Sequence, residues 1–385
     1  MNTATLRQRF RAAYPDADPA AMRAVRAPGR VNLIGEHTDY NDGLVLPAAI
    51  NLRAWIAFVR TTDRRVEIVL GDGDRDGFDL DAIGTRRNGW IDRLAGMAWS
   101  LGTRGVDLGG LRGVLLSEIP MGAGLSSSAA VEVAMAWALV DERPPLPPME
   151  LAIAAQSAEN DYIGVQSGLM DPFASACGQP GAALLLDCRS QEYRNVPLPL
   201  DRYALVACDT RAPHRLETSE YNARRAQCEA AVRVVARAHP EVRSLRDVTM
   251  EMLDEVRGLD DESHRRAEHV VKENERVTRT VDALESGRMD DVGRLFAESH
   301  ASLRDLYEVT SPELDALVEI ATGTPGVVAS RMTGAGFGGC TVNIVERHAV
   351  EGLREAVERE YPARSGRQPA VYDVKASEGA GEVAL

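Results

Sequence analysis

The chain has 385 residues, 44% hydrophobic and 26% charged, so it is too long for one ordinary core and too apolar to be disordered. Its 44 lysines and arginines against 58 aspartates and glutamates give a net charge of −14, which argues against nucleic acid as a partner. The lysines are only Lys272 and Lys375, and neither follows a glycine loop, which excludes Walker-type and protein-kinase phosphate sites. Any nucleotide phosphates must therefore be held by backbone amides, arginine and a metal.

The cysteines and the apolar segments predict a protein of the cytoplasm. The five cysteines are widely spaced and include no C-x-x-C pair, so we expect neither a disulfide framework nor a zinc site. The first residues lack the apolar stretch of a signal peptide, and no run approaches the roughly eighteen apolar residues of a membrane-spanning helix. We therefore expect a reduced, soluble protein without a membrane partner.

The first half of the chain alternates strand-like and helical segments. We expect a short amphipathic helix over 3–14, strands over 24–27, 31–34, 51–60 and 66–70, a helix over 90–101 and a strand over 111–117. Helices over 124–140 and 149–164 follow, and then buried strands over 182–188 and 203–208. The polar, proline-bearing stretch 189–202 is the expected domain boundary, giving domains of 1–190 and 191–385.

The second half is mostly helical. The expected order is helices over 217–238, 261–286, 290–306 and 311–322, a strand over 327–331, a glycine cluster, a strand over 341–345, a helix over 348–361 and a strand over 370–374. Strands and helices that mix without a regular βαβ rhythm favour an α+β fold over a doubly wound sheet.

A polar loop follows the second expected strand. Residues 32–43, here called the polar loop, read Asn-Leu-Ile-Gly-Glu-His-Thr-Asp-Tyr-Asn-Asp-Gly, and one residue separates them from Arg30. Polar side chains this dense are costly to bury unless they pair with one another or with a ligand. The loop is either solvated, with His37 as an incidental surface residue, or it forms a pocket for sugar hydroxyls, which need hydrogen bonds in fixed directions.

A second loop, residues 122–128, reads Gly-Ala-Gly-Leu-Ser-Ser-Ser, follows an expected strand and opens a helix. In this serine loop, glycines would let the backbone approach an anion, serines would cap free amides, and the helix dipole would add partial positive charge. A serine hydroxyl could also ligate Mg²⁺. The alternative is a well-capped helix with no ligand.

A third segment, the glycine loop of residues 332–340, fits G-x-G-x-x-G through Gly334, Gly336 and Gly339. We reject a dinucleotide site, because residues 341–345 alternate like a strand and do not open a helix. The glycine loop is then either a tight connection between two strands or a part of the pocket contributed by the second domain.

Two acidic residues lie in less distinctive surroundings. Glu159 is near the end of a helix, and Asp171 precedes Pro172, a pair that reads as a helix N-cap. Asp171 is also backed by apolar Met170 and Phe173, so it is equally a candidate acceptor for a hydroxyl proton.

These segments, in this order, closely resemble the galactokinases of the GHMP small-molecule kinase family. The resemblance is carried by residues 29–40 with Gly43 and 45–47, by 122–130, by 168–171 and by 331–340, with weaker similarity at 219–225 and 302–315. It implies a two-domain α+β fold, with a ribosomal-protein-S5-like first domain, a ferredoxin-like second domain and the active site in the cleft between them. After the second domain, the last expected strand, 370–374, could pair with the sheet of the first domain.

The resemblance also implies the reaction and the residues that perform it. A monomer would transfer the γ-phosphoryl group of ATP to the anomeric hydroxyl of galactose, with Mg²⁺ as cofactor, Asp171 as base and Arg30 as the cation beside it. The other implied contacts are Glu36, His37, Thr38, Asp39, Gly168 and Tyr221 for the sugar, Gly122, Ala123, Gly124, Leu125, Ser126, Ser127 and Ser128 for ATP, and Ser128 with Glu159 for the metal.

The sequence departs from the family at several places. Ser167 and Pro172 stand where the family usually has Cys and Gln, and the segment Trp90-Ile-Asp-Arg-Leu lacks the usual Asn-Tyr, so no adenine contact is assigned. Two alternatives stay open: a galactokinase-like sensor without turnover, and a kinase for a related sugar such as arabinose or N-acetylgalactosamine. The presence of the base, the cation and the phosphate loop argues against the sensor.

Overall fold

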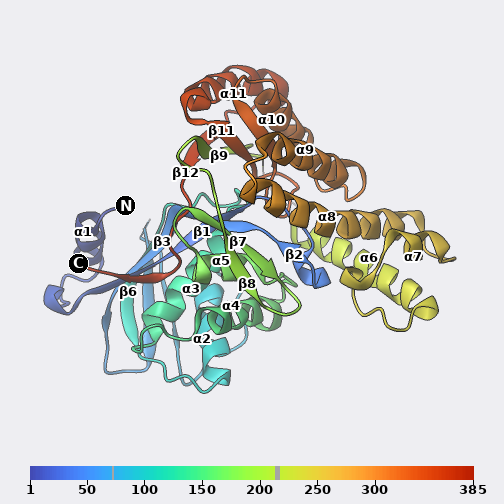
Figure 1. Cartoon of the computed structure of the whole chain (residues 1–385). Coiled ribbons are helices and arrows are strands. Elements are labelled where there is room, and N and C mark those ends of the chain that lie inside the picture. The colour runs from blue at the N-terminus through green and yellow to red at the C-terminus, as the bar shows by residue number, and fades with distance from the viewer. Residues whose placement is uncertain (72, 213–216) are drawn as a thin grey trace.

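A computed structural model of the chain describes residues 1–71, 73–212 and 217–385 (Figure 1). Its largest sheet has the strand order β13-β1-β3-β6-β4-β5, in which only β4 and β6 run parallel. The strands are β1 (Arg23–Asn32), β3 (Pro47–Arg60), β4 (Arg65–Leu70), β5 (Arg75–Asp79), β6 (Leu111–Ser117) and β13 (Gly381–Val383). Strand β1 unites the two strands expected over 24–34, because a bulge at Gly29 shifts the register without ending the pairing.

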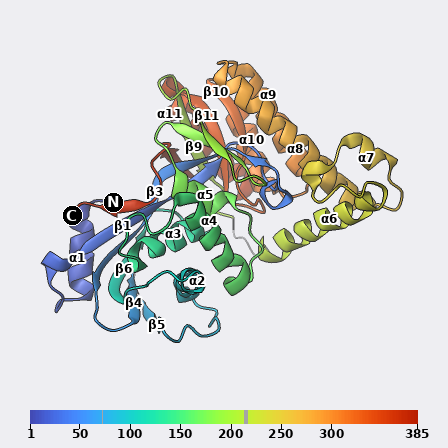
Figure 2. The same cartoon turned by 60° about the horizontal axis from the view of Figure 1, so that its bottom comes forward.

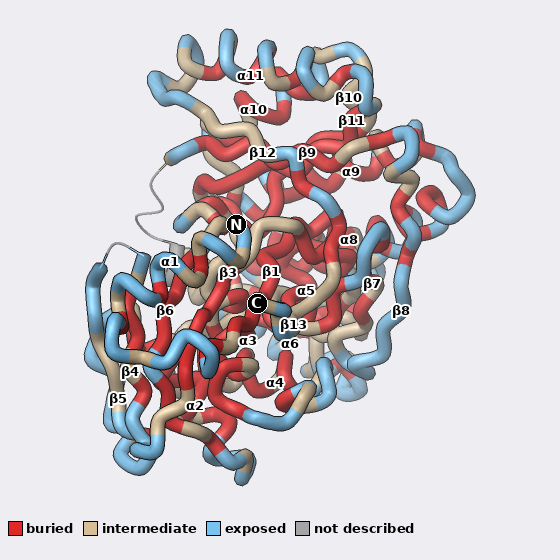
Figure 3. The backbone as a smooth tube through the Cα atoms, turned by 90° about the vertical axis from the view of Figure 1, so that its left-hand side faces the viewer, coloured by how far each residue is buried: buried red, intermediate tan, exposed pale blue. Residues whose placement is uncertain are grey.

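Helices cover both faces of this sheet. On one face lie α2 (Ile91–Thr103), α3 (Ser127–Leu139), α4 (Pro148–Ser157), a π-helical turn (Ala158–Ile163) and α5 (Met170–Cys177), and on the other lies α1 (Thr3–Ala13) (Figure 2). Alternate residues of β3 therefore enter different cores: Trp55 and Val59 pack with α1, and Ile56 and Phe58 with the helices opposite. Figure 3 shows β1 and β3 as the buried centre of this lobe.

The second lobe is built on a four-stranded antiparallel sheet of order β10-β11-β9-β12. Its strands are β9 (Tyr203–Asp209), β10 (Val327–Met332), β11 (Cys340–Glu346) and β12 (Ala370–Val374), and its helices are α9 (Met289–Asp305), α10 (Pro312–Thr322) and α11 (Val350–Ser365). Helices α6 (Glu217–Ala238), α7 (Met250–Glu255) and α8 (Asp261–Glu285) extend to one side (Figure 1). Residues of β9 and β11 share the main core with the first lobe, so the two lobes are packed against each other.

A third, small sheet corrects one expectation from the sequence. It has the order β2-β7-β8, with β2 (Leu44–Val45), β7 (Ala182–Asp187) and β8 (Tyr193–Pro197). The stretch 189–202 is therefore not simply a linker, since β8 lies within it and pairs with β7. Only Val196 of β8 is buried, which explains why this edge strand reads as a polar segment.

The mixture of sheets and helices confirms the predicted α+β class. The strand expected over 111–117 and the helix over 217–238 match β6 and α6, and a helix does begin near Asp171 as α5, whereas β2, β5 and α7 were not anticipated. The last strand expected from the sequence, 370–374, matches β12 and stays in the second lobe beside β9, whereas β13, which was not expected, pairs with β1 of the first lobe. Among the described residues, no helix is both long and apolar enough to cross a membrane.

Candidate active site

A cavity of about 710 Å³ is lined by residues of both lobes. All three loops recognised in the sequence reach it. The lining includes Glu36, His37 and Asp39 of the polar loop, Gly122 and residues 124–128 of the serine loop, and Gly334 and Ala335 of the glycine loop. The glycine loop connects β10 to β11 and also borders the cavity, which confirms both of its interpretations.

Arg30 and Asp171 form an ion pair at the wall of the cavity. The guanidinium donates through Nε to Oδ1 at 2.8 Å and through Nη2 to Oδ2 at 2.9 Å, the two-point geometry that arginine forms with carboxylates. Its third nitrogen donates to the Gly124 carbonyl at 2.5 Å, which ties the pair to the serine loop. The Arg30 side chain is 4% exposed and that of Asp171 is 28% exposed, so the carboxylate is the partner that faces the cavity.

The capping interpretation of Asp171 is wrong. Helix α5 begins at Met170, the N-cap residue is Leu169, and no side chain caps this helix end. Asp171 lies inside the first turn, where its carboxylate accepts hydrogen bonds from Arg30 and from the Ser126 hydroxyl. These donors orient the carboxylate away from the backbone of its own helix.

Asp39 lies against the backbone of Gly168. A Cβ atom built on Gly168 would stand 1.7 Å from Oδ2 of Asp39, so only glycine allows this approach. The carboxylate accepts from the backbone N–H groups of Tyr40 and Met170. Burial and the neighbouring charge of Asp171 raise the pKa of Asp39 to about 6.

His37 belongs to a buried chain of hydrogen bonds. Nε2 lies 3.1 Å from the Ala335 carbonyl and Nδ1 lies 2.9 Å from the Tyr40 hydroxyl, which is 2.8 Å from the hydroxyl of Tyr307. The thiol of Cys228 lies 3.2 Å from the Tyr307 hydroxyl. Because the carbonyl can only accept, Nε2 must carry the proton, and every later group in the chain donates towards His37.

These hydrogen bonds change the role expected for His37. Burial lowers the pKa of His37 to about 3, so the ring is neutral, and both of its nitrogens are already engaged. The ring therefore fixes the polar loop to the glycine loop and has no free nitrogen for a sugar hydroxyl.

Two residues expected to touch ligand, Thr38 and Ala123, lie outside the cavity lining. The hydroxyl of Thr38 is buried within 2.8 Å of the Gly35 carbonyl and 2.7 Å of the Leu44 carbonyl, so it braces the polar loop from inside. Ala123 is 1% exposed and packs in the core. Tyr221 does line the cavity, and its ring contacts those of His37 and Tyr40.

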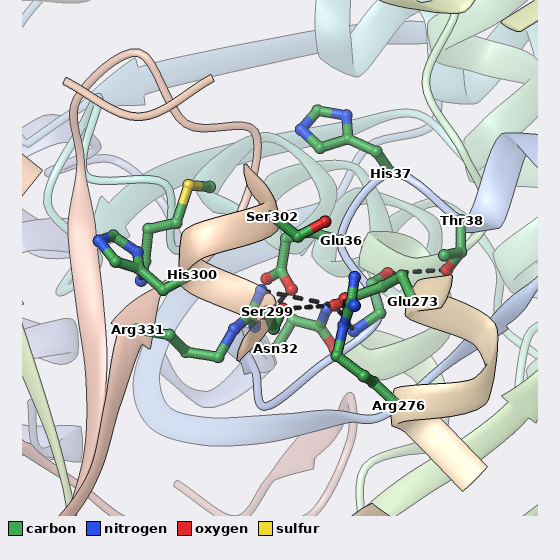
Figure 4. Close-up of polar contacts among 12 residues, drawn as sticks. Asn32, Glu36, His37, Thr38, Glu273, Arg276, Ser299, His300, Ser302 and Arg331 are labelled. Atoms are coloured by element: carbon green, nitrogen blue, oxygen red, sulfur yellow. Dashed lines mark hydrogen bonds and ion pairs between the residues drawn. The ribbon is translucent and has the colours of Figure 1, made fainter. Parts of the chain in front are cut away.

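Glu36 reaches the cavity but is held by the second lobe. Its Oε1 accepts from the Gly334 backbone N–H at 3.0 Å, and its Oε2 lies 2.5 Å from Nη1 of Arg331 (Figure 4). No role was predicted for Arg331, because its partner Glu36 is far away along the chain.

The serine loop is bent for close backbone approach, but its serines do not cap the helix. Gly122, Gly124 and Ser126 all have positive φ, and no side chain caps α3, because the Ser126 hydroxyl donates to Asp171 instead. The first backbone hydrogen bond of the helix runs from the Ala130 N–H to the Ser126 carbonyl. The amides of residues 127–129 therefore face out of the helix start, as in an anion site.

Beside the serine loop, two buried carboxylates share one arginine. Nη1 of Arg93 donates to Oε1 of Glu132 at 3.0 Å and to Oε1 of Glu159 at 2.9 Å. Ser167, at the usual cysteine position of the family, donates to Oε2 of Glu159 at 2.5 Å. Burial and the Glu159 charge raise the pKa of Glu132 well above its usual value. Arg93 and Glu132 were not predicted, since nothing in their local sequence marks them as partners.

This corner suits a hard cation. Ser128 and Glu159 both line the cavity, two carboxylates face one guanidinium, and within the described chain nothing donates to Oε2 of Glu132. Hydroxyl and carboxylate oxygens are the ligands that Mg²⁺ prefers. Within the same described ranges, no group of three or more His, Cys, Asp or Glu side chains could hold a metal, so a cation here would need serine, water or phosphate oxygens as well.

Part of the cavity lining is apolar. It is lined by Leu70, Trp90, Leu115, Leu116 and Met121. The indole Nε1 of Trp90 donates to Oδ2 of Asp74 at 2.7 Å, which fixes the ring at the rim. A flat apolar group would fit here, next to the serine loop.

Comparisons with known proteins agree with this arrangement. The galactokinase galactose-binding signature matches residues 8–60, the GHMP kinases N terminal domain matches 93–179, and the GHMP kinases C terminal domain matches 280–363. A galactokinase of Roseiflexus sp. (strain RS-1) is 45% identical over 386 residues, covering 100% of this chain and 98% of the relative.

Solved structures give the same result. The structure of Lactococcus lactis galactokinase complexed with galactose has a TM-score of 0.93 at 35% identity and covers 99% of each chain. Methanococcus jannaschii mevalonate kinase has a TM-score of 0.65 at 17% identity, covering 92% of this chain and 98% of that one, and supports the fold alone.

Proposed function

The chain belongs to the galactokinases of the GHMP kinase family, and we propose that its cavity binds galactose and ATP side by side and transfers the γ-phosphoryl group of ATP to the anomeric hydroxyl of the sugar. The products are galactose 1-phosphate and ADP. The observation that supports this most directly is the placement of the Arg30–Asp171 pair. Both residues line the cavity, and Arg30 also donates to the Gly124 carbonyl of the serine loop.

The sugar is proposed to lie against the polar loop. Glu36 and Asp39 accept hydrogen bonds from its hydroxyls, and the backbone of Gly168 and the side chain of Tyr221 complete the contact. Asp39 accepts from the ring hydroxyl that differs between galactose and glucose. A buried carboxylate left unpaired by glucose costs about 1–3 kcal/mol or more, so glucose is expected to be a poor substrate.

Asp171 is the proposed base. Arg30 and Ser126 fix both carboxylate oxygens, so the group that receives the hydroxyl proton is oriented before the sugar binds. Phosphoryl transfer depends mainly on positioning and charge stabilisation. Arg30, always charged, lies where it can offset negative charge on the transferred group.

ATP is proposed to place its phosphates at the serine loop and its adenine at the apolar part of the lining near Trp90. The free amides of residues 127–129 and the start of α3 would hold the phosphates. Ser128 and Glu159 would hold Mg²⁺, which when bound supplies positive charge to the phosphates. Arg93 donates to both Glu132 and Glu159 and so offsets the repulsion between the two carboxylates.

A sugar-panel assay with ATP and Mg²⁺ tests this function. Galactose, glucose, arabinose and N-acetylgalactosamine are offered separately, ADP release is followed by a coupled assay, and the phosphorylated position is assigned by phosphorus NMR. We expect turnover with galactose and a phosphate on its anomeric carbon. Equal kcat/KM for galactose and glucose would refute the role of Asp39, and binding of galactose without ADP release would identify a sensor.

We also propose that the protein acts as a monomer in the cytoplasm. Among the described residues, the exposed large hydrophobic side chains are Met1, Met121 and Tyr193. Three side chains so far apart in the sequence do not indicate the large apolar patch of a subunit interface. All five cysteines are unpaired, as expected in a reducing compartment.

A further inference from the structure

Four charged side chains are buried together where the polar loop meets the second lobe. Glu36 of the loop, Arg331 of β10, and Glu273 and Arg276 of α8 converge in Figure 4. Glu36 is 1% exposed, Arg331 and Glu273 are 0% exposed and Arg276 is 6% exposed. The cluster contains two positive and two negative groups, so its charges balance without solvent.

The same groups hold the backbone of the polar loop. Nη1 of Arg331 donates to the Leu33 carbonyl at 2.9 Å, and Oε1 of Glu273 accepts from the Gly35 N–H at 3.0 Å and from the Ser299 hydroxyl at 2.7 Å. His269 lies with Nε2 3.2 Å from the Glu36 carbonyl. Carboxylate, backbone and arginine are thus fixed relative to one another by groups that all come from the second lobe.

We propose that Arg331 is a positioning residue for the sugar: by holding the Glu36 carboxylate and the Leu33 carbonyl, it sets the acceptor that galactose meets. This presupposes the sugar contact of Glu36 proposed above. Arg331 does not line the cavity, so it acts through Glu36 and not by touching the substrate.

The electrostatics of the cluster explain why an arginine is needed there. Burial raises the pKa of Glu36, the charge of Glu273 raises it further, and Arg331 is the strongest influence in the opposite direction. The other charged or titratable groups near this point are Arg276, His269 and His300, and burial lowers the pKa of His269 to about 4, which leaves it neutral. Without Arg331, the Glu36 carboxylate would keep the hydrogen bond from the Gly334 N–H but would have no ion-pair partner among the described residues.

A purely structural ion pair between the lobes is the competing explanation. It predicts that loss of Arg331 lowers stability without a specific effect on galactose. The positioning role predicts a selective loss of galactose affinity and a change in its pH dependence, because Glu36 would take up a proton at higher pH.

Three variants and a matched control separate these explanations. Arg331→Met removes the charge, Arg331→Lys keeps the charge but not the forked geometry, and Glu36→Gln removes the acceptor charge. Arg266→Met is the control, because Arg266 is also 0% exposed and also paired, with Glu308 and the Leu306 carbonyl, but lies outside the cavity lining. For each, we measure thermal stability, galactose and ATP dissociation constants by calorimetry, and KM for galactose between pH 5.5 and 9.

We expect Arg331→Met to weaken galactose binding at least tenfold, about 1.4 kcal/mol, with ATP affinity within twofold of the wild type. The galactose KM of Arg331→Met should fall as the pH rises. The galactose KM of Arg331→Lys should be raised less than that of Arg331→Met and should keep the pH dependence of the wild type. Arg266→Met should lose stability but keep both affinities. If Arg331→Met does not fold, Arg331→Lys decides: galactose affinity equal to the wild type would overturn the inference.

The outcomes also distinguish this inference from the proposed site. If Glu36→Gln binds galactose as tightly as the wild type, Glu36 is not a sugar contact and both statements fail. If Glu36→Gln weakens galactose binding but Arg331→Met does not, or if Arg266→Met weakens it equally, only the positioning role is wrong.

Discussion

Replacing Gly168 by alanine tests the placement of Asp39 with the smallest possible change. The added Cβ would lie 1.7 Å from Oδ2 and 2.0 Å from Cγ of Asp39. An ordinary carbon–oxygen contact is about 3.3 Å, so the carboxylate must retreat by roughly 1.6 Å. That movement breaks its hydrogen bonds to the N–H groups of Tyr40 and Met170 and takes it away from the proposed sugar hydroxyl.

The loss can be estimated from the bond that is broken. A hydrogen bond to a charged group contributes about 1.5–3 kcal/mol, which corresponds to roughly a 10- to 150-fold fall in kcat/KM for galactose. The KM for ATP should stay within twofold, because the three atoms nearest to the added Cβ all belong to Asp39 and none to the serine loop. The measurement is steady-state kinetics with each substrate varied in turn, together with a thermal unfolding curve to show that the variant is folded.

Two further variants make the result specific. If the added methyl acts only by displacing Asp39, Gly168→Ala should cost little more on an Asp39→Ala background, so the two changes should be strongly non-additive. Gly352→Ala, in helix α11, is the control, because its Cβ would meet no atom within 4 Å. It should leave both KM values unchanged and stabilise the protein by roughly 0.5–1 kcal/mol. A galactose kcat/KM within twofold of wild type for Gly168→Ala would refute the sugar role of Asp39.

The other carboxylates give separate expectations. Asp171→Asn should lower kcat by roughly 10²–10⁴-fold with ATP affinity unchanged, and a loss smaller than about tenfold would contradict base catalysis. Because the pKa of Asp39 is raised to about 6, it becomes protonated and a weaker acceptor as the pH falls through that value, so kcat/KM for galactose should fall with it. An acid limb that persists in Asp39→Asn would assign it to another group. Burial would raise the pKa of Glu273, but Arg276, His269 and Arg331 together lower it to about 2 from 4.5, so it stabilises the fold fully above pH 4.5 and progressively less below. Denaturant unfolding of Glu273→Gln between pH 5 and 3 should therefore depend less on pH than that of the wild type, and equal slopes would contradict this.

Local patterns in the sequence were enough for most helices and strands. Residues 111–117 and 217–238 were predicted as they occur, because their apolar residues recur at strand and helix spacing along one continuous segment. Strand β8 was missed because it is an edge strand with one buried residue, and β5 because it has no buried residue at all. Elements that bury little leave little periodicity in the sequence.

The active site could be predicted as a set of loops but not as a set of contacts. Asp171 was compatible with an N-cap because the sequence does not reveal that Arg30, 141 residues away, is its partner. His37 was expected to hold the sugar from the resemblance to the family, and the sequence could not show that its ring contacts Ala335, 298 residues further along the chain. Arg331 was noticed only as the start of a motif for the same reason. In each case the polar partner lies far away along the chain, so the spacing of residues within a local segment cannot indicate it.

The pairing of β13 with β1 has a consequence for synthesis of the protein. Residues 381–383 form the outer strand of the first lobe, in the register Ala24 opposite Val383 (Figure 2). Until the ribosome has delivered these residues, β1 presents unpaired N–H and C=O groups along that edge, although almost all of the lobe has already emerged. A chain that stops short of residue 381 therefore keeps an open edge at β1, and this lobe is not protected from pairing with its neighbours until residues 381–383 have been made.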